Sequence, residues 1–122
     1  MATSYEARWV SIKGAQERRW WVRIKAKLDT GAKRCSIDAG LAEALGLEPI
    51  GSVSVRNAMG RQERPLVSAK VRVGRTTHEV EMTVADRRHL KCPMLLGKMF
   101  LDEMELQPST LPKSKGDFPQ FI

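Results

Sequence analysis

The stretch Ile24–Lys33, which reads IKAKLDTGAK, decides how this sequence folds. It ends a segment, Trp20–Leu28, with the composition of a β-strand, and its lysines alternate with apolar residues as on a strand with one face on a core. Asp29-Thr30-Gly31 follows directly, where the strand ends and the chain must turn. A given tripeptide occurs by chance in about one chain of this length in fifty. Alone, it indicates only a turn at a strand end.

Other segments of the chain carry strand patterns as well. They lie at residues 9–12, 52–56, 67–73 and 79–84, and the last three alternate apolar with polar residues. A polar turn near residues 14–17 joins the first of them to the strand that ends at Leu28. Gly74-Arg75 separates the last two, and glycine at the first central position suits a type II′ turn. These signals predict a hairpin over residues 67–84.

Helical spacing is rare in this sequence. Leu41, Ala44 and Leu45 lie on one helical face, with Asp38 placed to cap the helix and Gly46 placed to end it. A second short helix is predicted over 98–104. Because strands dominate and no strand–helix–strand alternation occurs, we predict a mainly β fold, a small closed or partly closed antiparallel barrel with one or two short helices.

Length and charge narrow the function. With 122 residues the chain has room for one domain with one core, and its net charge of +7 favours an anionic partner. Two cysteines, Cys35 and Cys92, are too few for a disulfide framework, and neither a signal peptide nor a membrane span of about 20 apolar residues is visible. We therefore expect a cytoplasmic protein that makes no contact with a membrane.

Two downstream segments make the Asp-Thr-Gly turn more informative than it is alone. One is the helical pattern Leu41–Leu47, and the other is Met94–Gly97 (MLLG), an apolar strand that ends in glycine. Together the three segments resemble the retropepsin-like aspartic proteases. The likeness narrows to the RimB-type branch, labelled ATP-dependent zinc protease, over about residues 9–102. Relatives in that branch often have a histidine at the end of the segment that here reads Arg34–Asp38 (RCSID).

The resemblance assigns the catalytic carboxylate to Asp29, in a loop completed by Thr30 and Gly31. Hydrolysis of an amide by such an enzyme needs two facing aspartates that share one proton. The other four aspartates lie in no second copy of the motif, at Asp38, Asp86, Asp102 and Asp117. The second catalytic carboxylate must then come from another subunit, which predicts a symmetric homodimer.

Further roles follow from the same resemblance. The flap that would close over a peptide substrate corresponds to Arg56, Asn57, Ala58, Met59 and Gly60, with Lys33 in the groove below it. The catalytic loop would be supported by Ala32, Leu95, Leu96 and Gly97. Without the resemblance, residues 56–62 would be an ordinary hairpin tip. The domain would span residues 9–104, after an N-terminal tail at 1–8 and before a C-terminal tail at 105–122 that is a candidate dimer contact.

Cations crowd the sequence around Asp29, with seven of them between Arg18 and Arg34. A solvated strand face would explain Lys25 and Lys27, whereas a basic groove would suit acidic peptides, including the glutamate-tailed substrate associated with RimB-type relatives. Two other functions stay open, a non-catalytic dimerisation or adaptor module of the same fold and a basic nucleic-acid-binding barrel, which Arg18–Arg23 (RRWWVR) would suit. We favour the endopeptidase, with an acidic polypeptide rather than nucleic acid as its partner.

Neither a metal nor a nucleotide cofactor is expected. Only His89 and Cys92 are closely spaced soft ligands, and the sequence contains no paired-cysteine or His-Glu-x-x-His motif. A glycine-rich phosphate loop is also missing, because Gly97-Lys98 belongs to the predicted core strand and its end.

Overall fold

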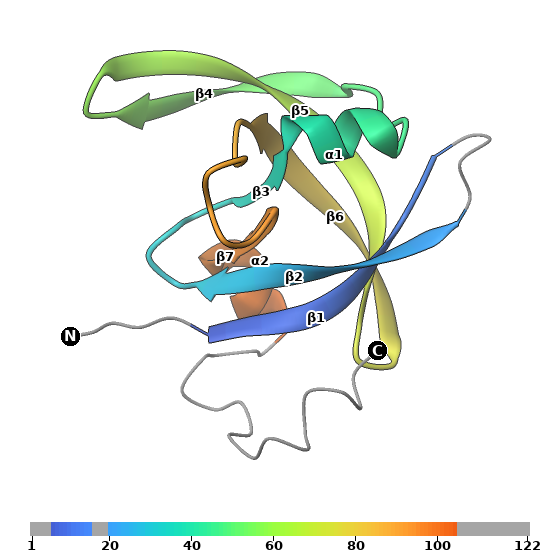
Figure 1. The fold of residues 1–122 in the computed structure, drawn as a ribbon. Coiled ribbons are helices and arrows are strands. Elements are labelled where there is room, and N and C mark those ends of the chain that lie inside the picture. Colours follow the sequence, from blue (N-terminus) through green and yellow to red (C-terminus); the bar gives the residue numbers. More distant parts are fainter. Residues whose placement is uncertain (1–5, 16–19, 105–122) are drawn as a thin grey trace.

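A computed structural model describes residues 6–15 and 20–104 of the chain (Figure 1). The predicted C-terminal tail and its dimer contact, part of the polar turn, and the basic residues Arg18 and Arg19 lie outside the described residues. The strands and helices are β1 (Glu6–Lys13), β2 (Trp21–Asp29), β3 (Cys35–Asp38), α1 (Ala39–Ala44), β4 (Gly51–Asn57), β5 (Gly60–Val73), β6 (Thr76–Ala85), β7 (Met94–Gly97) and α2 (Lys98–Glu103). β1 thus begins before the expected domain start at Trp9.

Six strands close into a barrel. They are hydrogen-bonded in the order β1-β2-β7-β3-β6-β5, and a short pairing between β1 and β5, Ser11 with Arg72 and Ile12 with Val71, closes the ring. β4 pairs only with β5 in this order, and Figure 1 shows the β4–β5 hairpin projecting beyond the barrel. The prediction of a small closed barrel with two short helices is confirmed.

The prediction that the barrel is antiparallel is wrong for two strand pairs. β2 runs parallel to β7, and β3 runs parallel to β6. The sequence did not indicate β3, because Cys35, Ser36 and Ile37 are all buried and a strand without an exposed face has no alternation. The parallel pairing of β2 with β7 brings the C-terminal ends of these two strands together, with Asp29 opposite Gly97.

The core lies inside the barrel and consists of the inward residues of the strands together with buried residues of the two helical segments. Its largest fully buried side chains are Ile12, Leu28, Ile37, Leu45, Met82, Met94, Leu96, Leu101, Val10, Val67 and Val71. The buried apolar residues of β2, β5 and β6 occupy alternate positions, so the period-two pattern predicted the buried faces of these three strands.

Both predicted helices and the predicted hairpin form. Asp38 caps α1 by accepting a hydrogen bond from the amide of Leu41 at 3.2 Å, and Gly46 follows the helix with a φ of 73°. Gly74 has a φ of 65° in the turn between β5 and β6. Glycine adopts this left-handed conformation more readily than other residues do. Neither helix in the described part of the chain is long and apolar enough to cross a membrane.

Candidate active site

The candidate catalytic residue, Asp29, is the last residue of β2. It lies opposite Gly97 in the parallel ladder with β7. Its Oδ1 atom accepts a hydrogen bond from the amide of Gly31 at 2.9 Å, and its carbonyl oxygen accepts one from Ala32 at 3.2 Å. These bonds hold the carboxylate in a tight turn, with 29% of the side chain exposed. Thr30, between them, is exposed.

The turn continues across the end of β7 and is fastened to α2. The amide of Lys98 donates a hydrogen bond to the carbonyl of Ala32 at 2.6 Å, and the amide of Met99 donates one to the carbonyl of Lys33 at 3.2 Å. A Cβ atom on Gly97 would lie 2.5 Å from the carbonyl oxygen of Arg34, which is closer than any real contact. The crossing therefore requires glycine at position 97.

The supporting residues predicted from the sequence surround this crossing. Leu96 is completely buried and pairs with Leu28, whereas Leu95 is half-buried and lines the adjacent pocket. Cys35 lies below Gly97, and its Sγ atom accepts a hydrogen bond from the amide of Gly97 at 3.5 Å. Burial raises the pKa of this thiol, and the hydrogen bond from Gly97 partly opposes that effect.

Lys27 is a charged neighbour of the candidate carboxylate. It lies two positions before Asp29 on the same strand face, and its Nζ atom is 3.4 Å from Oδ2 of Asp29. Both side chains are about one-third exposed, so solvent screens the ion pair. The pair places a cation beside Oδ2, the carboxylate oxygen that does not accept the hydrogen bond from Gly31.

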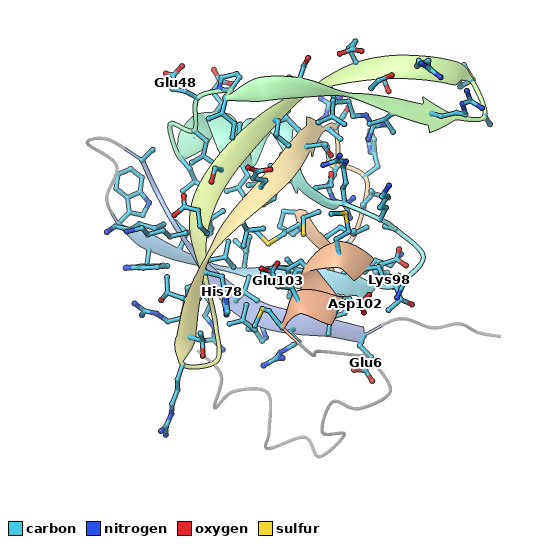
Figure 2. All side chains as sticks on the ribbon, turned by 180° about the vertical axis from the view of Figure 1, so that it is seen from behind. Glu6, Glu48, His78, Lys98, Asp102 and Glu103 are labelled. Atoms are coloured by element: carbon cyan, nitrogen blue, oxygen red, sulfur yellow. The ribbon has the colours of Figure 1, made fainter. Side chains whose placement is uncertain are left out.

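The other described aspartates have partners elsewhere. Asp38 caps α1 and also accepts a hydrogen bond from the amide of Arg87 at 2.8 Å. Asp86 pairs with Arg88 at 2.9 Å. Asp102 pairs with Lys98 at 2.8 Å along α2, where Figure 2 labels both residues. Within residues 6–15 and 20–104, the aspartates other than Asp29 thus have capping or ion-pair partners of their own, as Asp29 has in Lys27, and none of them lies in a second Asp-Thr-Gly turn.

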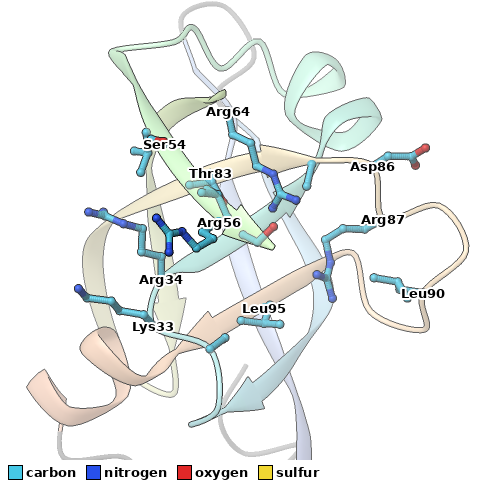
Figure 3. A pocket seen from close by; sticks show the side chains of 15 residues that line it. Lys33, Arg34, Ser54, Arg56, Arg64, Thr83, Asp86, Arg87, Leu90 and Leu95 are labelled. Atoms are coloured by element: carbon cyan, nitrogen blue, oxygen red, sulfur yellow. The ribbon is translucent and has the colours of Figure 1, made fainter. Parts of the chain in front are cut away.

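A cleft of about 630 Å³ lies next to the Asp-Thr-Gly turn (Figure 3). It is bounded by Ala32 and the residues after it, by β4 and β5 of the projecting hairpin, and by the segment 85–90. Five cations line it, namely Lys33, Arg34, Arg56, Arg64 and Arg87. Figure 3 shows Arg34, Arg56 and Arg64 around the opening, whereas the side chain of Asp86, the cleft's acid, points away. The cleft is therefore strongly electropositive.

A smaller pocket of about 270 Å³ adjoins the cleft, because both are lined by Arg87, Leu90 and Leu95. Arg87 is buried, and its Nε atom donates to the carbonyl of Cys92 at 3.0 Å. Desolvation lowers the pKa of Arg87, while electrostatic interactions with Cys92, Asp38 and Asp29 act in the opposite direction.

The predicted flap residues form the tip of the β4–β5 hairpin. Asn57 pairs with Gly60 across the turn, Ala58 is exposed, and 94% of Met59 is exposed. Gly60 has a φ of 117°, a backbone angle that residues with a side chain rarely adopt. Arg56, on the hairpin, and Lys33, just after the Asp-Thr-Gly turn, both line the cleft.

Sequence reasoning missed two of the cations that line the cleft. Lys25 lies exposed on the outer face of β2, 5.5 Å from the centre of the Trp9 ring, in agreement with the solvated strand face that the sequence suggested. Arg64 and Arg87 do line the cleft, although neither is near Asp29 in sequence. Arg64 follows the hairpin alternation, but Arg87 lies in a loop and carried no pattern that could have predicted its burial.

The residues available for zinc do not fit a metal site. Among the described residues, no group of three or more His, Cys, Asp or Glu side chains could hold an ion together. His89 and Cys92 line the smaller pocket, but they do so together with Lys27, Arg87 and Lys91. Cations in that number disfavour a divalent ion.

The structure thus combines a closed β-barrel, one Asp-Thr-Gly turn and a cleft lined by the β4–β5 hairpin. The sequence model described as "Aspartyl protease" matches residues 10–100, and the chain belongs to that family. Among curated proteins, no match to the sequence is found.

Solved structures show the same fold. The EIAV protease in complex with the inhibitor HBY-793 superimposes with a TM-score of 0.65 at 16% identity, over 85% of this chain and 91% of that one. The Simian Foamy Virus (mac) protease superimposes with a TM-score of 0.61 at 17% sequence identity, over 84% of this chain and 99% of that one. A retropepsin-like aspartic protease from Rickettsia conorii superimposes with a TM-score of 0.50 at 19% sequence identity, over 84% of this chain and 85% of that one. The fold is retropepsin-like.

Proposed function

We propose that two copies of this chain form an aspartic endopeptidase in which the two Asp29 carboxylates face each other across a twofold axis. The observation that carries the proposal is the position of Asp29, which is part-exposed at the end of β2 and held by the Gly31 amide beside an open cleft. One such carboxylate per chain makes half of a dyad. From the resemblance of its motifs we also propose that the chain belongs to the RimB-type branch, and from its two free cysteines that it acts in the cytoplasm.

The chemistry of such a dyad needs one shared proton. The ionised carboxylate removes a proton from water while the water oxygen bonds to the carbonyl carbon of the peptide, and the protonated carboxyl gives its proton to the carbonyl oxygen. Collapse of the tetrahedral intermediate breaks the C–N bond, and the nitrogen leaves with a proton from the dyad. The two carboxyls titrate as a pair rather than singly. Thr30 would brace the facing loops, and the hairpin tip at 57–60 would cover the peptide.

The substrate that we propose is an acidic polypeptide. Five cations line the cleft, and its acid, Asp86, is already paired with Arg88. A segment of glutamates or aspartates would meet complementary charge over the whole opening, whereas a basic peptide would be repelled. Glutamate-tailed proteins are one source of such a segment.

Asp29→Asn tests the function, with Asp102→Asn as the matched control because it makes the same chemical change on an exposed α2 residue. We expect Asp29→Asn to remove cleavage of an acidic peptide library while folding and dimerisation persist, and Asp102→Asn to retain both. Cleavage that survives in a well-folded Asp29→Asn protein would contradict the proposal. Sedimentation that finds only monomer under assay conditions with full activity would also contradict it.

A further inference from the structure

The outer face of β1 and β2 carries a second set of cations, outside the cleft. We name it the tryptophan–cation face, and its residues are Trp9, Lys13, Trp21, Arg23, Lys25 and Arg72. They share one face because β1 and β2 pair antiparallel, with Trp9 opposite Lys25 and Lys13 opposite Trp21. β5 adds Arg72, which pairs with Ser11 of β1.

Each of the two tryptophans on this face holds two cations. Arg23 lies 4.8 Å and Lys25 5.5 Å from the centre of the Trp9 ring. Arg72 lies 4.3 Å and Lys13 5.9 Å from the centre of the Trp21 ring. All four are within the range of a cation–π attraction. The indoles thus fix the positions of four charges that would otherwise move freely in solvent.

The face is continuous with the candidate active site. Outward positions of β2 follow one another as Trp21, Arg23, Lys25, Lys27 and Asp29. Lys27 belongs to this row, lines the pocket next to the cleft, and forms the ion pair with Asp29. Cationic side chains therefore lead along β2 to the candidate carboxylate, over about 27 Å from Trp21.

Apart from Asp29 at its end, this row carries no negative charge. Among the described outward positions of β1 and β2 up to residue 27, the other two are Ala7 and Ser11, so none is acidic. Cations already lie against both indoles, so a base would have to displace them in order to stack on a ring. An extended acidic chain needs no such displacement. The arrangement favours an acidic polypeptide over single-stranded nucleic acid.

We propose that the tryptophan–cation face is a docking surface for an acidic polypeptide segment that extends from the cleft along β2. This docking surface rests on the proposed peptidase function, because the docked segment is part of the substrate that the peptidase would cleave. An extended chain of about eight residues would span the row from Asp29 to Trp21. The surface would raise affinity for long acidic substrates without touching the bond that is cleaved.

The test uses the full chain carrying Asp29→Asn, so that binding is measured without cleavage. Fluorescence anisotropy compares a labelled 20-residue glutamate peptide with a labelled 6-residue one. Arg23→Glu is added to the inactive chain, and Arg75→Glu is its matched control, since Arg75 is an exposed arginine in the turn between β5 and β6. Thermal unfolding of each variant checks that it is folded.

We expect Arg23→Glu to weaken binding of the long peptide about tenfold at low salt, with the loss shrinking as salt rises. The affinity of the Arg23→Glu protein for the short peptide should stay within about twofold of the parent value. Arg75→Glu should change the affinity for neither peptide. Equal weakening of both peptides by Arg23→Glu, or no weakening of the long one, would overturn the docking surface while leaving the peptidase proposal intact. Tighter binding of a thymidine oligonucleotide than of the long peptide, lost in Arg23→Glu, would overturn it in favour of nucleic acid.

In the active enzyme, Arg23→Glu should raise KM for the long substrate and leave kcat unchanged, because the face lies away from the reacting bond. A change confined to kcat would contradict a docking role. If no cleavage is found for any variant, the peptidase proposal fails, and the anisotropy comparison still decides the surface.

Discussion

Gly97 lies beside Asp29 in the parallel ladder of β7 and β2, and its missing side chain makes room for the backbone of Arg34. The chain after the Asp-Thr-Gly turn crosses the end of β7 at this point, so one glycine sets how closely the two meet. The position of the candidate carboxylate depends on that crossing, because Ala32 and Lys33 are bonded to the start of α2.

Gly97→Ala should therefore destabilise the protein by about 1–3 kcal/mol or more, because the new Cβ meets backbone atoms that cannot rotate away. Gly51→Ala is the control, since a Cβ there meets nothing within 4 Å, and it should change stability by less than about 1 kcal/mol. Urea unfolding monitored by circular dichroism measures both. Equal stability of the two variants would show that the crossing tolerates a side chain.

Asp38 joins α1 to the loop that carries Arg87. Its two oxygens accept from the amides of Leu41 and Arg87, so Asp38→Ala removes a helix cap and leaves the Arg87 amide without this acceptor. We expect a loss of about 2–3 kcal/mol in unfolding free energy. Asp38→Asn keeps one acceptor oxygen and should lose less. A loss as large in Asp38→Asn would mean that charge, rather than the hydrogen bonds, sets the effect.

Arg64 tests the cleft as an acidic-substrate site. Arg64→Gln should raise KM for an acidic peptide about fivefold at low salt, because one of the five lining cations is lost. Arg61→Gln, on the same strand but outside the cleft lining, should leave KM within about twofold. The effect of Arg64→Gln should fade as salt rises and be absent for a neutral peptide. An equal effect on both peptides would rule out charge as its cause.

The lowered pKa of Asp86, in the loop that borders the cleft, predicts that the stability of the fold depends on pH. Hydrogen bonds from the Arg88 side chain and backbone lower its pKa from 3.8 to about 2. A lowered pKa means that the Asp86–Arg88 pair stabilises the fold above pH 3.8 and that this contribution is lost as pH falls toward 2. Titration of the Asp86 carboxyl by NMR should find the low value, and Arg88→Gln should return it toward 3.8. A normal value in the parent protein would show that the pair is not formed in solution.

The sequence identified the site's centre but only part of its surroundings. The alternation in β2, β5 and β6 indicated which faces are buried, and the Asp-Thr-Gly turn with Met94–Gly97 indicated the crossing. Lys25 and Lys27 show the limit of such reasoning. They share one strand face, but only Lys27 is close enough to Asp29 to form an ion pair, and Lys25 is held by Trp9.

Local sequence by itself determined the strands other than β3, both helices and the turn that carries Asp29, because alternation, capping and glycine conformation act between residues close together in the chain. Only the tertiary structure decided that β2 and β7 run parallel and that β3 exists, since a fully buried strand has no exposed face to mark it. It also decided which cations share the cleft, because Lys33, Arg64 and Arg87 meet only after the barrel closes. Charge complementarity is a property of that closed surface and not of any one segment.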